Sequence, residues 1–302
     1  MPVQPTRPAL RSHGLLFFDL PADSYDALSD GMRAEEEWTF GFNTVENHLA
    51  HLSSWAPSIN AWARRLPWPK GSVHVDIGGG PGLLAYIVAR QGYHSIAVEL
   101  EATNLAAGVL LQEGIEPSAE RSLDLWVADI FALPLPDCSV DFVTVKEVLH
   151  HLPNVDLLLR ELARVLKPGG KVYVWEPFWP SRWIYPIRWL LVDRYLKPRE
   201  LRVGIRHIYY SLGDYRRMFR DSVFRAELHV NLAQTSFRHY LSRHRLMFGA
   251  LHAILDPADF IAFPPKCSDR RSIRPEDFIS SRYLQRALCD AAACKRYLDS
   301  LV

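Results

Sequence analysis

Short apolar runs alternate with longer amphipathic segments through the middle of this chain. Apolar residues dominate positions 73–77 and 95–99, and the segment 83–89 between them is typical of a helix. A second helix at 103–114 and a strand at 125–129 follow. Short runs bounded by glycine or proline predict buried strands, and the longer segments predict helices.

The alternation continues to residue 176, and its periodicity is clearest in this second part. After a strand at 141–145, a helix begins near Asn154 and carries apolar side chains at 155, 158, 159, 162, 165 and 166. Spacings of three and four residues place these side chains on one helix face. Lys167-Pro168-Gly169-Gly170 predicts the end of the helix, and residues 171–176 predict a fifth strand.

A glycine-rich loop follows the first strand, with the spacing Asp76-x-Gly78-x-Gly80-x-Gly82. Glycine lets the backbone approach a bound ligand closely and adopts positive φ without a steric penalty. The spacing differs from the G-x-G-x-x-G pattern that binds the pyrophosphate of dinucleotides, and pyrophosphate would repel the carboxylate. The loop resembles the first motif of class I S-adenosylmethionine (SAM)-dependent methyltransferases, in which it accommodates a cationic amino-acid tail.

Acidic residues also end the second and third strands. A carboxylate at Glu99 can accept hydrogen bonds from both ribose hydroxyls of an adenosine. Dinucleotide-binding folds also place an acid about 20 residues after their glycine loop, so Glu99 alone does not separate the two classes. Two plainer alternatives stay open: Glu99 is a solvated strand end, and Asp129 only caps a loop.

The ordered motifs between residues 71 and 176 resemble the SAM-binding core of the type 11 methyltransferases. This resemblance implies an α/β fold: a Rossmann-like, doubly wound, mostly parallel sheet with its ligand at the carboxyl ends of the strands. It implies S-adenosyl-L-methionine as the cofactor.

The resemblance also implies a role for each motif residue. Asp76 and the glycine loop line the methionine moiety, Glu99 holds the ribose, and Asp129 accepts a hydrogen bond from the adenine amine. Leu100 covers the adenine, and the backbone around Lys146 closes the site near the sulfonium. The predicted cofactor-binding set is Asp76, Gly78, Gly79, Gly80, Gly82, Glu99, Leu100, Asp129, Ile130 and Lys146.

The chemistry of methyl transfer requires alignment and exclusion of water rather than a metal, and the sequence predicts no metal site. A general base is needed only for a hydroxyl or a carbon acid, and His150 is the candidate catalytic residue because it follows the fourth strand. The Leu-His-His-Leu stretch resembles one found in family members with unrelated substrates, which favours a structural role instead. The sequence excludes two other enzyme classes. A short-chain dehydrogenase would need a Tyr-x-x-x-Lys pair and a P-loop enzyme would need its glycine-rich motif, and the chain has neither.

Composition indicates a globular protein, with 48% hydrophobic and 23% charged residues among 302. The four cysteines form no C-x-x-C pair, so they predict free thiols in a reducing compartment. No apolar stretch approaches the roughly 18 residues of a membrane span, and no signal peptide is recognisable. We therefore expect a cytoplasmic location.

Three regions are predicted: an N-terminal tail and helical cap (1–70), the SAM-binding core (71–233) and a C-terminal extension of unassigned role (234–302). Residues 1–12 resemble a disordered tail. Helices are expected at 25–28, 35–42 and 45–65, and Trp38, Phe40 and Phe42 either face a ligand or pack in the core. Within the core, residues 177–210 predict a basic, aromatic insert. Ser211-Leu212-Gly213-Asp214 resembles a capping box, and residues 223–232 predict a further strand.

Charge is concentrated after the fifth strand, since residues 177–250 hold 14 Lys or Arg against 5 Asp or Glu, a net +9. Basic, aromatic helices can lie in a membrane interface or attract anionic partners, and the alternative is a solvated cap helix. The Asn/Asp-Pro-Pro-Tyr motif of amino-group methylation is absent, and no RNA-binding module is recognisable, so we expect no nucleic-acid partner.

The sequence therefore predicts a SAM-dependent methyltransferase that acts on a small apolar or aromatic molecule. The acceptor atom (O, N or C) and the oligomeric state stay open. The alternative is a SAM-binding module without transfer activity, which serves interaction or regulation.

Overall fold

The computed structural model describes residues 10–12, 14–18, 55–100, 105–152, 154–178, 210–231 and 249–257. The predicted helices at 25–28 and 35–42, with Trp38, Phe40 and Phe42, lie outside these residues. So does the predicted insert 177–210, apart from its ends at 177, 178 and 210. Most of the predicted extension 234–302 also lies outside.

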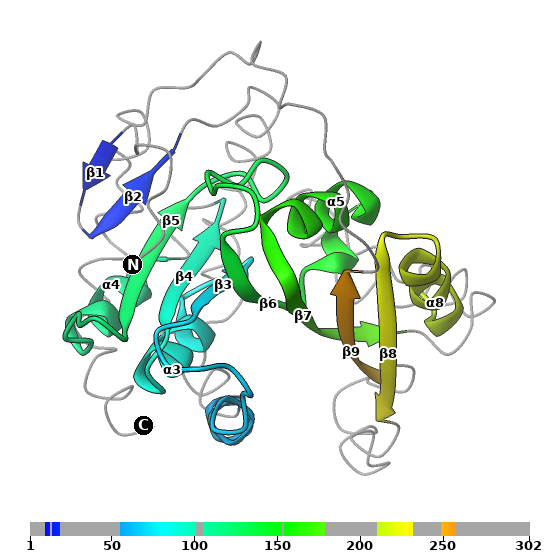
Figure 1. Cartoon of the computed structure of the whole chain (residues 1–302), viewed down its shortest axis with the longest axis horizontal. Helices are drawn as coiled ribbons and strands as arrows, with labels where there is room; N and C mark the ends of the chain where they lie inside the picture. Colours follow the sequence, from blue (N-terminus) through cyan, green and yellow to red (C-terminus); the bar gives the residue numbers. More distant parts are fainter. Residues whose placement is uncertain are drawn as a thin grey trace, which may run out of the picture.

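A nine-stranded sheet has the order β1-β2-β5-β4-β3-β6-β7-β9-β8 (Figure 1). Its five central strands are parallel. They are β3 (Val73–Ile77), β4 (His94–Glu99), β5 (Ser122–Val127), β6 (Val140–Lys146) and β7 (Leu166–Phe178). The chain builds β4 and β5 on one side of β3, then returns to build β6 and β7 on the other. This switch at β3 is where open α/β sheets bind ligands, and the predicted doubly wound fold is confirmed.

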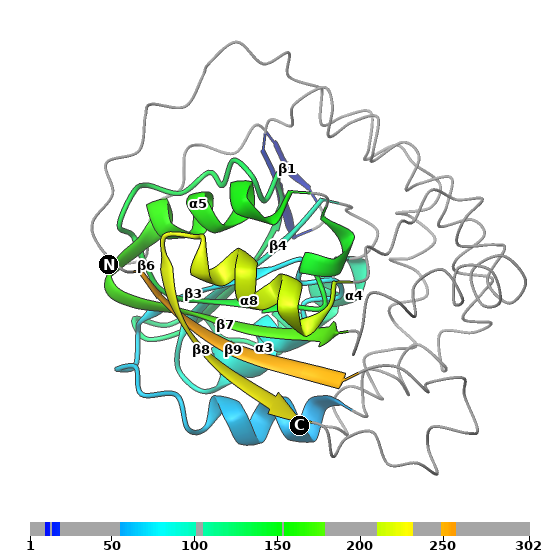
Figure 2. The ribbon, with the colours of Figure 1, turned by 90° about the vertical axis from the view of Figure 1, so that its right-hand side faces the viewer.

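Helices cover both faces of the sheet (Figure 2). On one face lie α5 (Val155–Val165) and α8 (Leu212–Arg220). On the other lie α3 (Leu83–Arg90) and a helix at residues 55–63. Two further helices among the described residues are α4 (Ala106–Glu113) and the short η1 (Leu149–His151).

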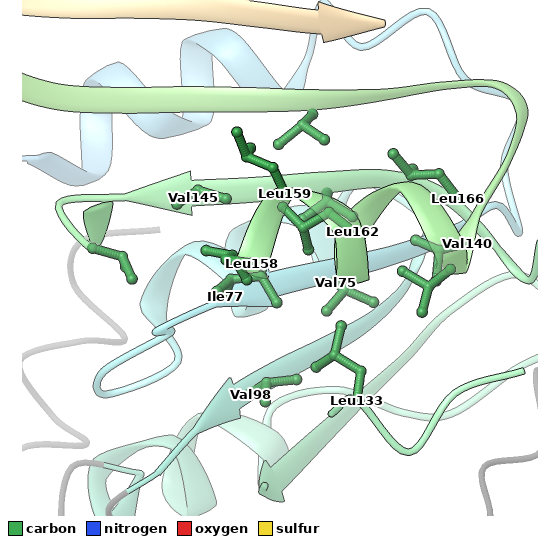
Figure 3. Close-up of a cluster of buried hydrophobic side chains, with 14 of the residues drawn as sticks. Val75, Ile77, Val98, Leu133, Val140, Val145, Leu158, Leu159, Leu162 and Leu166 are labelled. Carbon is green, nitrogen blue, oxygen red and sulfur yellow. The ribbon is translucent and has the colours of Figure 1, made fainter. Parts of the chain in front are cut away.

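The periodicity of α5 is confirmed for five of the six predicted apolar positions; all six are buried, but Leu166 already begins β7. Leu158, Leu159 and Leu162 point at the strands, where they meet Val75, Ile77 and Val145 (Figure 3). Since side chains alternate along a strand, the odd-numbered residues of β3 fill this core. His74 and Asp76 therefore point to the opposite face, towards α3.

The sheet includes a strand that lies beyond residue 233, the predicted end of the core. The Ser211–Asp214 capping box is present at the start of α8, and β8 (Phe224–Asn231) follows it. However, β9 (Gly249–Pro257) lies between β7 and β8 and is antiparallel to both. The strand predicted at 223–232 is therefore present at 224–231, but not next to the fifth one. The connection from β8 to β9 is long, so the sequence pattern does not indicate this pairing.

The sheet also includes strands that precede residue 71, the predicted start of the core. A hairpin of β1 (Leu10–Ser12) and β2 (Leu15–Phe17) adds to the sheet, with β2 parallel to β5. The expected disordered tail at 1–12 is therefore wrong for residues 10–12. Strands of three residues are too short to produce a periodic pattern, although burial of all of residues 15–18 explains their apolar character. Among the described residues, no helix has the length and apolarity needed to cross a bilayer.

Candidate active site

The predicted site residues meet at the carboxyl edge of the central strands. Ile77 pairs with Val98 of β4 and with Val145 of β6, and Glu99 pairs with Val127 of β5. The segments that follow these strands therefore emerge side by side. The structure thus brings together the glycine loop, the end of β4, the loop after β5 and the end of β6.

The glycine loop leaves open space at one position. Gly78 has φ +62°, and a Cβ there would lie 2.4 Å from Val148 Cγ2, so packing requires glycine. Gly82, with φ +74°, begins α3 and approaches Leu125. Gly80 has φ +49°, and an added Cβ would meet no heavy atom within 4 Å. The backbone at Gly80 therefore borders free space.

Glu99 connects the end of β4 to this loop. One of its carboxylate oxygens, Oε2, accepts a hydrogen bond from Gly80 N at 3.1 Å, and Oε1 accepts one from Leu100 N at 2.8 Å. Glu99 is therefore not simply a solvated strand end. Because each carboxylate oxygen can accept more than one hydrogen bond, this arrangement is compatible with additional hydroxyl donors beside Gly80.

Asp129 caps the loop after β5, as the plainer of its two interpretations predicted. Its side chain is buried, and Oδ1 accepts a hydrogen bond from Phe131 N at 2.8 Å, which forms a turn after β5. Ile130 packs against the core of the α5 face, and Leu100 packs against the core of the α3 face. The contacts of all three residues with adenine stay predictions.

Asp76 is almost fully buried, and its Oδ1 accepts a hydrogen bond from Thr144 Oγ1 at 2.6 Å. Burial, with a smaller contribution from Glu99, raises the pKa of the Asp76 carboxyl to about 7, although Thr144 and Lys146 act in the opposite direction. This carboxyl therefore titrates near neutral pH. A cation bound at the glycine loop would favour its ionised form.

Lys146 ends β6 and anchors the helix at residues 55–63. Its Nζ lies 4.2 Å from the centre of the Trp55 ring and 3.3 Å from Glu147 Oε1. Trp62 of the same helix contacts Trp175 of β7, with ring centres 4.7 Å apart. The helix predicted over 45–65 is thus confirmed at 55–63. Trp55, at the start of its described part, lies at the carboxyl edge of the sheet beside Lys146.

His150 rests on a buried acid that the sequence interpretation did not assign to the site. Glu176 Oε1 accepts hydrogen bonds from Val148 N and Leu149 N at 2.6 and 2.7 Å. Its Oε2 lies 2.8 Å from His150 Nδ1 and 3.4 Å from Tyr215 Oη. The signal for Glu176 was present, because it is another acid near the end of an apolar strand.

This contact assigns the tautomer of His150. A carboxylate only accepts hydrogen bonds, so the His150 proton lies on Nδ1 and the basic lone pair lies on Nε2. A base whose other nitrogen is oriented by an acid is a recurring catalytic arrangement. The same contacts hold η1 in place, so the geometry serves a structural role as well.

The donor set fits a ligand such as SAM. Free space borders Gly80, an acid within the glycine loop can balance an ammonium group, and the Glu99 carboxylate can accept hydroxyl protons. Within the described residues, no group of three or more His, Cys, Asp or Glu side chains is arranged to hold a metal ion.

Comparison with known proteins agrees with the fold. Residues 75–174 match the model of a family described as a methyltransferase domain. The fold is similar to that of geranyl diphosphate C-methyltransferase from Streptomyces coelicolor, with a TM-score of 0.50 and 16% identity, over 67% of this chain and 76% of that one. The central part of this chain is a class I SAM-dependent methyltransferase domain.

Two relatives with similar sequences are methyltransferases of quinone biosynthesis. The chain is 32% identical over 129 residues to the ubiquinone/menaquinone biosynthesis C-methyltransferase UbiE of Rubrivivax gelatinosus, which is 41% of this chain and 49% of that protein. It is 33% identical over 100 residues to the ubiquinone biosynthesis O-methyltransferase of Aeromonas salmonicida, which is 33% of this chain and 41% of that protein. The chain thus spans about half or less of the length of these relatives. Its central part thus matches a methyltransferase domain, and the geranyl diphosphate C-methyltransferase of similar fold was solved in complex with S-adenosyl-L-homocysteine.

Proposed function

We propose that this protein binds SAM at the carboxyl edge of its sheet and transfers the methyl group to a small molecule. The observation that carries this proposal is the open space at Gly80, which lies against the Glu99 carboxylate and within the loop that begins at Asp76. A loop that only made a turn would require neither open space at that position nor an acid hydrogen-bonded to it.

Four groups of the chain hold the cofactor in this proposal. Asp76 balances the ammonium group, and the backbone of the glycine loop borders the methionine moiety. Glu99 accepts hydrogen bonds from the ribose hydroxyls, and the adenine lies between Leu100 and Ile130, near Asp129. The backbone at Lys146 closes the site, while its side chain contacts Trp55 and Glu147.

When bound, SAM supplies a methyl group that is already activated for displacement. The protein then has to align the acceptor and exclude water, which contributes several kcal/mol. For an acceptor that must lose a proton, His150 Nε2 takes that proton while Glu176 stabilises the resulting imidazolium through Nδ1. An amine acceptor would not need this base.

The proposed acceptor is a small apolar or aromatic molecule. Two observations support this class: aromatic side chains at Trp55 and Trp175 lie near the carboxyl edge, and the names of the related enzymes concern ubiquinone and menaquinone biosynthesis. The basic segment 177–250 adds the proposal that the protein contacts an anionic or membrane surface in the cytoplasm.

Release of S-adenosylhomocysteine (SAH) from SAM, measured with a panel of phenols, quinols, amines and carbon acids, tests this function. The expected result is release that depends on one acceptor class and disappears in the His150→Asn variant only when that class must lose a proton. Tight SAM binding with no release for any acceptor would favour the alternative, a binding module that serves interaction or regulation.

A further inference from the structure

Four buried polar side chains form a continuous line across three strands, inside the apolar layer between the sheet and α3. Ser95 Oγ lies 2.7 Å from His74 Nδ1, and His74 Nε2 lies 2.9 Å from Thr144 Oγ1. Thr144 Oγ1 donates to Asp76 Oδ1 at 2.6 Å. Ser95, His74 and Thr144 are 0% exposed, and Asp76 is 2% exposed.

Strand register explains this line. His74 pairs with Ser95 of β4, and Asp76 pairs with Thr144 of β6, so all four side chains point to the same face of the sheet. Phe142 stacks on the His74 ring with centres 4.7 Å apart, and its packing helps to exclude water. A buried polar group without a partner is costly, so each member of the line depends on the next.

When Asp76 is ionised, the direction of every hydrogen bond in this line is fixed. An ionised carboxylate only accepts, so Thr144 must donate to it and accept from His74 Nε2–H. His74 Nδ1 then accepts from the Ser95 hydroxyl. Burial lowers the pKa of His74 to about 3, so the ring is neutral and has one proton to place.

The other oxygen of Asp76 faces the glycine loop, since Oδ2 lies 3.3 Å from the position of a Cβ on Gly79. The charged groups around this carboxyl are Lys146 on β6 and Glu99 on β4, while α3 contributes the backbone N–H of Ala85. On its own strand, the neutral His74 is the nearest titratable group. Thr144 is therefore the side chain that donates directly to the carboxylate.

We infer that Thr144, oriented by His74, is a positioning residue for cofactor binding, which keeps the Asp76 carboxylate ionised and directed at the ammonium end of the ligand. This inference rests on the proposed function, because it assumes that a ligand with an amino-acid tail binds at the glycine loop. It adds that recognition of this tail depends on buried side chains that do not touch the ligand.

Two ligands separate this role from a purely structural one. SAH carries the amino-acid tail, whereas 5′-methylthioadenosine has the same nucleoside and thioether without it. Calorimetric titration of both ligands from pH 6 to 8.5 would compare the wild type with Thr144→Val, Thr144→Ser and Ser95→Ala. Ser95→Ala is the matched control, because it removes a buried hydroxyl from the same line without removing the donor to Asp76.

The expected result is a loss of SAH affinity of about 10-fold or more in Thr144→Val at pH 7. Affinity should recover as the pH rises, because the carboxyl of this variant needs a higher pH to ionise. Affinity for 5′-methylthioadenosine should stay within about 3-fold, and Thr144→Ser should bind SAH like the wild type.

Three outcomes would overturn the inference. The first is a Thr144→Val variant with unchanged SAH affinity and pH profile, and the second is an equal loss of both ligands, which indicates a packing role. If Thr144→Val fails to fold, the third is a Thr144→Ser variant whose SAH affinity or pH profile differs from that of the wild type, since this variant keeps the hydroxyl donor. A wild-type protein that binds neither ligand would instead refute the proposed function.

Discussion

Replacing Gly80 with leucine separates ligand binding from folding. Gly80 has φ +49° and no heavy atom within 4 Å of an added Cβ, so the Cβ of a leucine meets no steric obstacle in the ligand-free protein. The left-handed conformation costs an L-residue about 1–2 kcal/mol. At about 2–4 °C per kcal/mol for a domain of this size, the Tm should fall by only a few degrees.

Binding should respond differently, because the leucine side chain fills the space proposed for the methionine moiety. We expect the affinity for SAH to fall at least 100-fold, which corresponds to about 2.7 kcal/mol. Gly169→Leu is the matched control, since Gly169 has φ +79°, also has no atom within 4 Å, and lies at the amino end of β7. It should lose the same few degrees of Tm and keep its SAH affinity.

Thermal unfolding and calorimetry on both variants separate a loss of SAH binding from a loss of folding stability. A Gly80→Leu variant that binds SAH like the wild type would refute the placement of the ligand, and so would an equal loss of affinity in Gly169→Leu. Gly78→Leu provides a contrast, because its Cβ would lie 2.4 Å from Val148 Cγ2 and should destabilise the fold itself.

Four further predictions follow from the site. Glu99→Ala should weaken SAH binding by roughly 2–4 kcal/mol while the exposed Glu116→Ala control does not, and an unchanged Kd in calorimetry would contradict the ribose role. His150→Asn should lower the rate of methyl transfer to a proton-losing acceptor by about 10²–10⁴-fold at unchanged SAH affinity, and an unaltered rate would leave only the structural role. In the ligand-free protein, burial raises the pKa of Asp76 from 3.8 to about 7, so the stabilisation by its proton is present below pH 4 and is lost as the pH rises through 7. Asp76→Asn should therefore raise the Tm at pH 8 but not at pH 4, with weaker SAH binding; equal Tm changes at both pH values would be inconsistent with that titration. Neutralising the basic residues of 177–210 should abolish salt-sensitive co-sedimentation with anionic vesicles and spare SAH binding, whereas a wild type that ignores such vesicles in low salt would remove the membrane proposal.

Local patterns in the sequence were sufficient to predict the central strands, α5 and the capping box of α8. Each depends on residues within one turn or one strand, as the burial of Leu158 and Leu162 and the Ser211–Asp214 contacts illustrate. The placement of β9 depends instead on a pairing with β7 across a long connection. Such non-local contacts leave no periodic signal in the sequence.

The same limit applies within the site. The glycine loop and the strand-end acids could be predicted because family motifs preserve their spacing. Thr144 and His74 could not, because they appear as ordinary members of buried strands until the register places them beside Asp76 and Ser95. Glu176 could have been proposed from its strand-end position, but its contacts with η1 depend on the fold of residues 148–150.

The central claim is that the glycine loop of this chain binds SAM. Calorimetric titration of the purified, full-length protein with SAM and, separately, with a nicotinamide dinucleotide tests it most directly. We expect saturable binding of SAM in the micromolar range without added metal, and no heat from the dinucleotide. Tight dinucleotide binding with no heat from SAM would contradict it.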